Sequence, residues 1–121
     1  MEDILMPNKR GSRYEMSLTY KVVVSDDAVS DLRRYVGYLI NVKRNPQAAS
    51  NLLDDYDETI TVLTSVAGSL RLCESPNMTK RNLRRINFLH HNYFMLYRFE
   101  EQTAFITNIF HGLEDADNKL R

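Results

Sequence analysis

The spacing of apolar residues in this chain changes near Gly68. Between Ala28 and Val66 they recur every three or four residues, the period of one face of an α-helix. Beyond Leu83 they fall into short runs rich in β-branched and aromatic residues, which is typical of strands. The sequence therefore predicts a helical part followed by a sheet part. The length of 121 residues favours a single domain for both.

The helical part divides into two amphipathic helices. A strand-like segment, 18–24 (LTYKVVV), ends at Ser25, which can cap the first helix. Asn45-Pro46 stops that helix and suits the start of a second one, because asparagine caps helices and proline fits the first helical position. So short a connection predicts an antiparallel helical hairpin.

Three strand candidates make up the sheet part, at residues 83–89, 93–99 and 103–110. The segments between them are short and polar, so consecutive strands should pair antiparallel. Residues 70–73 are a weaker strand candidate, residues 74–82 carry the composition of a loop, and the tail from 111 to 121 should fray or end in a helical turn. The fold class predicted is α+β, with two layers in β-α-α-β-β-β order. The helical hairpin packs on one face of an antiparallel sheet and leaves the other face open to solvent or a partner.

The polar first segment, residues 1–17, should be a native flexible extension or an artificial remnant, and residues 18–121 a single domain. No apolar run approaches the length of about 20 residues that a membrane span needs, and the amino terminus does not resemble a secretory signal. Cys73 is the single cysteine, so no internal disulfide can form. These features predict a cytoplasmic protein without a membrane partner.

The charges cancel overall but are unevenly placed along the chain. Sixteen basic and sixteen acidic residues give no net charge, which argues against a protein that coats nucleic acid by bulk charge. Between Arg71 and Arg98 there are nevertheless six basic residues and one acid, whereas four acids occupy the five positions 54–58. The sequence therefore predicts a local basic surface that can bind an anion.

Four motifs, taken in order, resemble the RelE/ParE superfamily of toxins from bacterial type II toxin–antitoxin systems. They are the strand-to-helix segment YKVVVSDDAVSDL, the helix start NPQAASNLL, the arginine Arg84 that opens the next strand in RNLRRI, and the hairpin NYFMLYRF–TAFITNIFHG. The resemblance extends from about residue 18 to residue 113. It implies an antitoxin as the main partner and leaves the oligomeric state open.

The superfamily contains two mechanisms on one scaffold. One is the ribosome-dependent cleavage of messenger RNA, with the ribosome and mRNA as partners. The other is the non-enzymatic poisoning of DNA gyrase by ParE-like members. The long helical hairpin and the ending IFHGLED look closer to ParE. We expect the endoribonuclease because it accounts for a grouping of arginine, histidine and tyrosine. Gyrase poisoning and a degenerate, non-toxic family member remain the alternatives.

RNA cleavage without a metal needs groups that move protons and a cation that neutralises the phosphate. Arginine suits the phosphate and histidine suits proton transfer near neutral pH. The candidates are therefore Arg84 or Arg85 for the phosphate, His111 for the proton and Tyr97 for orienting a base. Each also has a structural interpretation, because edge arginines are often solvated and an apolar tyrosine stripe usually belongs to a core.

Arg84 and Arg85 should point to opposite faces of the sheet, because side chains alternate along a strand. Arg84 shares its face with Ile86 and other core residues, which favours Arg85 for the open face, whereas the resemblance favours Arg84. The sequence leaves the choice open.

Lys80, Arg81 and Arg98 are candidates for binding RNA or phosphate beside these arginines. We expect no cofactor and no metal site. Adjacent histidines such as His90 and His91 diverge on an extended chain, and no zinc-binding spacing is present. The acidic run at 54–58 is interpreted as the exposed face of the second helix.

Overall fold

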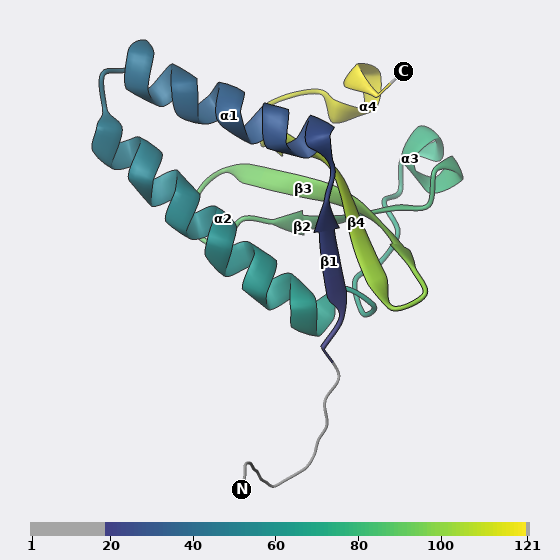
Figure 1. Ribbon diagram of the computed structural model, residues 1–121. Coiled ribbons are helices and arrows are strands. Elements are labelled where there is room, and N and C mark those ends of the chain that lie inside the picture. Colours follow the sequence, from purple (N-terminus) through teal and green to yellow (C-terminus); the bar gives the residue numbers. More distant parts are fainter. Residues whose placement is uncertain (1–18, 121) are drawn as a thin grey trace, which may run out of the picture.

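The computed structural model describes residues 19–120, so the extension predicted at residues 1–17 lies outside the described range. The elements follow one another as β1 (Lys21–Val24), α1 (Asp26–Asn41), α2 (Pro46–Val66), α3 (Pro76–Lys80), β2 (Leu83–Asn87), β3 (Tyr93–Glu100), β4 (Thr103–His111) and α4 (Ala116–Lys119) (Figure 1). None of the described helices has the length and apolarity that crossing a bilayer requires.

The two long helices begin where the sequence predicts. The Ser25 hydroxyl accepts a hydrogen bond from the Ala28 amide at 3.1 Å, and the Asn45 side chain accepts one from the Ala48 amide at 3.0 Å. Both caps pair backbone N–H groups that have no partner within the helix. Pro46 occupies the first turn of α2. The helical hairpin is thus confirmed, and its turn lies between the end of α1 at Asn41 and the Asn45 cap of α2.

The sheet has the strand order β1-β4-β3-β2. The three later strands pair antiparallel as predicted, but β1 pairs parallel with β4, so the sheet is mixed. The antiparallel rule applies to strands joined by short turns, and the whole helical hairpin and two strands separate β1 from β4. A β-bulge between Leu96 and Tyr97 shifts the register of β3 and β4.

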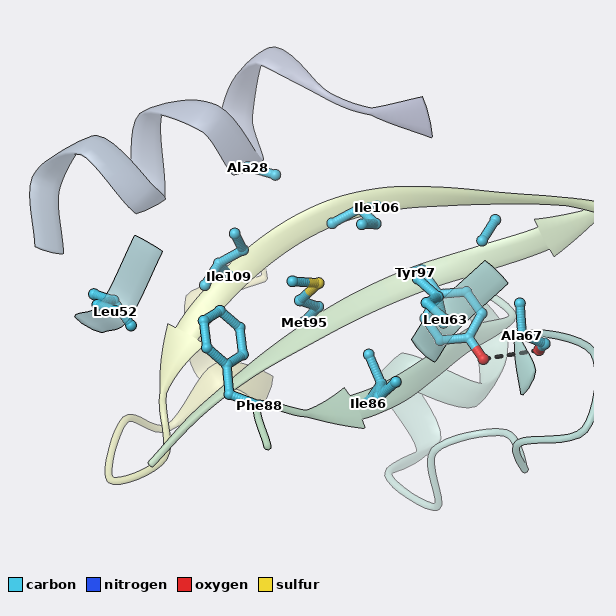
Figure 2. Close-up of a cluster of buried hydrophobic side chains, with 11 residues drawn as sticks. Ala28, Leu52, Leu63, Ala67, Ile86, Phe88, Met95, Tyr97, Ile106 and Ile109 are labelled. Atoms are coloured by element: carbon cyan, nitrogen blue, oxygen red, sulfur yellow. Dashed lines mark hydrogen bonds between the residues drawn. The ribbon is translucent and has the colours of Figure 1, made fainter. Parts of the chain in front are cut away.

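The helical hairpin covers one face of this sheet and forms the main core (Figures 1 and 2). Leu52 and Leu63 of α2 are fully enclosed there. The strands, and Phe88 just after β2, contribute to the same core: Ile86, Phe88, Met95, Tyr97, Ala104, Ile106 and Ile109. Burying each large apolar side chain contributes about 1.5–3 kcal/mol, so this face holds the two layers together.

The opposite face of the sheet, which we call the second face, is less open than predicted. The short helices α3 and α4 lie on it, next to each other and away from α2 (Figure 1). Ser75 and Asn77 both hydrogen-bond to Asp117, which joins the two helices. A second apolar cluster fills the space beneath: Met78, Leu83, Phe94, Leu96, Phe110, Ala116 and Leu120.

Two weaker predictions on this side need correction. Residues 74–82 were expected to form a loop, yet they contain α3, whose cap is Ser75. The strand candidate at 70–73 is reduced to one bridge between Leu72 and Arg84. Helices of one turn are too short to show a periodic pattern, so sequence spacing could not reveal α3.

Candidate functional site

Arg84 and Arg85 lie on opposite faces of β2, as the alternation of side chains predicts. Arg84 is on the helix-covered face with Ile86, and Arg85 is on the second face, where it pairs across the sheet with Leu96. The choice left open by the sequence is thereby decided: Arg85, and not Arg84, belongs to the second face.

Arg84 and Tyr97 meet at the carboxyl end of α2. The Tyr97 hydroxyl donates a hydrogen bond to the Ala67 carbonyl at 2.8 Å (Figure 2). Arg84 Nη1 donates to the same oxygen at 3.2 Å. The Arg84 guanidinium also lies 5.0 Å from the centre of the Phe99 ring. The last carbonyls of a helix have no partner within the helix. These two side chains therefore supply donors to the end of α2.

Tyr97 is completely buried, with 0% of its surface exposed. Burial raises the pKa of its hydroxyl to about 12, although the neighbouring Arg84 charge acts in the opposite direction. The hydroxyl therefore keeps its proton at neutral pH and acts as a donor to Ala67. No face of this ring is available for stacking on a base in the structure described.

His111 ends β4 on the helix-covered face. Its ring packs edge-on against Tyr93, with ring centres 5.0 Å apart. The Leu113 amide donates to His111 Nδ1 at 3.2 Å, so Nε2 carries the proton of the neutral ring. The ring lines a pocket of about 470 Å³, together with Tyr38 of α1 and Lys43 just beyond that helix.

Tyr35 and Glu114 form a hydrogen-bonded pair behind His111. The Tyr35 hydroxyl donates to Glu114, and the His111 amide donates to Glu114 at 2.9 Å. Burial, reinforced by the bond to Glu114, raises the pKa of Tyr35 above its usual range. Burial alone would also raise the pKa of Glu114, but the bonds from Tyr35, the His111 amide and Lys119 outweigh it and lower that pKa. At neutral pH the pair is a neutral tyrosine and a carboxylate, and neither is ready to transfer a proton.

The predicted catalytic residues are not gathered at one point. Arg84 is paired with Tyr97 across the sheet, whereas His111 is paired with Tyr93. Tyr93 and Tyr97 are four residues apart along β3, which corresponds to about 13 Å at the usual rise of a strand. Arg85 lies on the other side of the sheet. The structure thus brings Arg84 and Tyr97 together and separates them from both His111 and Arg85.

The predicted phosphate-binding residues lie on or beside the second face. The Arg85 guanidinium stacks 3.7 Å from the centre of the Phe94 ring, and its Nε donates to Asn87 at 2.8 Å. Arg98, on the same face, pairs with Glu100 at 2.6 Å. Lys80 and Arg81 are exposed at the end of α3, just before β2. Lys80, Arg81, Arg85 and Arg98 therefore lie on or beside one side of the sheet, but Arg98 is paired with an acid of the chain itself and Arg84 lies on the other face.

A groove of about 550 Å³ lies beside α3 and α4 on the second face. Arg71 and Arg85 line it together with four acidic residues: Glu74, Glu114, Asp115 and Asp117. Three of these acids come from the carboxyl-terminal tail, which the fold returns to the sheet. The groove is consequently mixed in charge, and an all-acidic ligand would meet repulsion in part of it.

The sequence interpretation of the acidic run was wrong for one residue, Asp55. Asp55 is 1% exposed, and its carboxylate accepts hydrogen bonds from the Leu89 and His90 amides, each at 3.0 Å, and from His91 Nδ1 at 2.6 Å. Burial would raise its pKa, but these hydrogen bonds prevail and lower it. The helical period did carry the signal, because Asp55 follows the buried Leu52 by three residues.

The residues just described fall within one recognised sequence family. Residues 22–116 match the family model of the ParE toxin of the type II toxin–antitoxin system parDE. This chain belongs to the ParE toxin family. It is therefore a toxin of the type II toxin–antitoxin class, which confirms the resemblance to the RelE/ParE superfamily.

Solved structures share the fold of this ParE-family chain at low sequence identity. A chain of the chromosomal ParDE system from P. aeruginosa is 20% identical, with a TM-score of 0.63, and the match covers 78% of this chain and 98% of that one. A chain of the RelBE2 toxin–antitoxin complex from Mycobacterium tuberculosis is 14% identical, with a TM-score of 0.51, and covers 77% and 98%. A search of curated protein sequences found no match.

Proposed function

We propose that this ParE-family toxin arrests growth by binding DNA gyrase, without cleaving RNA, and that a cognate antitoxin keeps it inactive. The observation that carries the proposal is the dispersal of Arg84, Arg85 and His111 over two faces and two ends of the sheet. Cleavage requires charge neutralisation and proton transfer at the same phosphate. Poisoning by contact requires only a complementary surface.

The Tyr97 hydroxyl and the Arg84 guanidinium, the predicted catalytic groups that lie closest together, already have structural partners. Tyr97 and Arg84 share the Ala67 carbonyl, and Tyr97 has no exposed surface. A base could stack on Tyr97 only if the end of α2 moved away. These hydrogen bonds give Arg84 and Tyr97 structural roles that do not require catalysis, which supports the proposal.

A contact surface is available at the outer end of the helical hairpin. Three large apolar side chains at the end of α1 and just beyond it are exposed: Tyr38, Ile40 and Val42, the last at 63%. Lys43 lies 5.7 Å from the centre of the Tyr38 ring. Exposed apolar residues gathered at one end of a helix are typical of protein–protein contacts. We assign the gyrase contact to this end.

The proposal is tested with the purified protein in a gyrase supercoiling assay. We expect loss of supercoiling with the wild type and relief of that inhibition by Val42→Asp, which places a charge in the proposed contact. Leu113→Asp is the matched control, because Leu113 is 83% exposed beside the carboxyl-terminal tail. If Leu113→Asp relieves inhibition and Val42→Asp does not, the tail makes the contact. Undisturbed supercoiling at high toxin concentration refutes the proposal.

One observation favours a second function, ribosome-dependent cleavage of mRNA. Arg85, Lys80 and Arg81 remain on or next to the second face, and no carboxylate pairs with Lys80 or Arg81 among residues 19–120. In that case Arg85 would bind the phosphate. Arg85→Ala would then relieve arrest of translation, whereas under the gyrase proposal it leaves supercoiling inhibition unchanged.

The antitoxin is proposed from the family and from the solved relatives, which come from toxin–antitoxin systems. The groove beside α3 and α4 fits a short segment with both charges, because Arg71, Arg85 and four carboxylates line it. Coexpression with the neighbouring reading frame, followed by copurification, tests whether such a partner exists.

A further inference from the structure

We propose that Asp55, Glu58 and His90 form a binding site for a divalent transition metal ion, with Zn²⁺ as the best match. One ligand atom from each of the three side chains lies within 4.8 Å of the other two. The site joins the middle of α2 to the turn between β2 and β3, and the proposed toxin function uses none of its residues. Sequence spacing predicted no metal site, because His90 follows Glu58 by 32 residues.

The three side chains converge because of two separate local geometries. Asp55 and Glu58 are three residues apart on α2, so they lie on neighbouring parts of the same helix face. His90 comes from the turn that follows β2, and its Nε2 lies 2.9 Å from Glu58 Oε1.

The donor set is characteristic of zinc. Imidazole and carboxylate are common Zn²⁺ ligands, and three protein ligands with water in the fourth position form an open site. Mg²⁺ and Ca²⁺ prefer oxygen ligands alone, so the imidazole of His90 favours Zn²⁺, Co²⁺ or Ni²⁺. The site is therefore expected to discriminate between these two groups of metals.

Asp55 provides a rigid anchor for the site. Its buried carboxylate is fixed by the Leu89 and His90 amides and by His91 Nδ1 at 2.6 Å. Hydrogen bonds of this kind orient a carboxylate ligand and are part of most metal sites. The same two amide bonds hold the turn, and hence the His90 ring, above α2.

Only small movements of exposed groups are needed to admit the ion. With bonds of about 2.1 Å, tetrahedral ligand atoms lie about 3.4 Å apart. The contact between Glu58 and His90 must therefore open slightly, and the widest ligand separation of up to 4.8 Å must close. Glu58 and His90 can make this change, because their side chains are 58% and 63% exposed. The bound ion would cross-link α2 to the β2–β3 turn and stabilise the fold.

The test uses the full chain without a histidine tag, stripped of metal and titrated with ZnCl₂ in a calorimeter. We expect one ion per chain and a higher Tm, and Co²⁺ should give the visible absorption of tetrahedral coordination. His90→Gln and Glu58→Gln should each weaken Zn²⁺ binding at least tenfold. MgCl₂ at the same concentration should leave Tm unchanged.

Asp54→Asn and Asp57→Asn are the matched controls, because both acids are exposed on the same helix but outside the cluster. They should bind Zn²⁺ like the wild type. The proposal is overturned if Zn²⁺ does not bind, or if it binds equally well to the His90→Gln and Glu58→Gln variants. Because both substituted side chains are exposed, these variants should fold, and a supercoiling assay in the absence of metal reports on the toxin function separately.

Discussion

The shared acceptor at the end of α2 allows a sharp test of the role of Tyr97. Tyr97→Phe removes one hydroxyl from a fully buried ring and leaves the ring in place. The Ala67 carbonyl keeps Arg84 Nη1 as a donor at 3.2 Å, so it does not lose every partner. A net hydrogen bond contributes about 0.5–1.5 kcal/mol, and we expect a loss of about 1 kcal/mol in the free energy of unfolding.

Arg84→Met is the reciprocal change, because Tyr97 then remains as the donor to Ala67 at 2.8 Å. The double variant removes both of these donors and leaves the carbonyl at the end of α2 without them. An unsatisfied buried carbonyl costs about 1–3 kcal/mol, so the double variant should lose more than the two single losses added together. This excess is the coupling that the shared acceptor predicts.

Urea unfolding of the four proteins, monitored by circular dichroism, measures these differences. A loss of about 1 kcal/mol should lower Tm by roughly 4–8 °C in a domain of this size. Growth arrest by Tyr97→Phe should stay near the wild-type level under conditions in which the variant is folded. Additive losses would refute the shared acceptor. Abolished arrest in a stably folded Tyr97→Phe protein would show that the hydroxyl acts on a substrate.

Four further substitutions test other parts of the structure. Gly37→Ala should stabilise α1 by up to about 1 kcal/mol, because the new Cβ meets no atom closer than 3.8 Å, whereas Gly68→Ala should lower Tm because its Cβ would lie 2.7 Å from the packed Tyr20 hydroxyl. Glu114 has a lowered pKa in the folded protein, so it stabilises the fold above its unfolded pKa and this contribution is lost as the pH falls through the folded value. Glu114→Gln should therefore flatten the decline of Tm as the pH falls below the usual range of a glutamate, and an unchanged decline would contradict the assignment. Asp55→Asn should cost about 3 kcal/mol in chemical unfolding, because hydrogen bonds to a buried charge are strong, and a loss comparable to that of the exposed Asp57→Asn would contradict this interpretation.

The helical hairpin could be predicted because its signals are local. Ser25 and Asn45 cap helices through bonds to amides three residues away, and the apolar period needs no knowledge of the rest of the fold. The parallel pairing of β1 with β4 could not be read in the same way. It depends on a contact between residues 82 positions apart, such as Val24 and Ile106.

The site residues show the same division between local and long-range information. Alternation along one strand correctly separated Arg84 from Arg85. The distance between Arg84 and His111 depends on how three strands are placed in register, and no motif encodes that directly. Asp55 was misplaced because four neighbouring acids suggest an exposed face, although its position in the helical period favoured burial.

A titration that counts toxin molecules per target tests most directly whether this protein acts by contact. Increasing amounts of the purified chain are added, in parallel, to DNA gyrase and to translating ribosomes with labelled mRNA. Action by contact predicts that supercoiling falls until toxin and gyrase are roughly equimolar, while the message remains intact. Cleavage of many messages by each toxin molecule, with supercoiling unaffected, would contradict it.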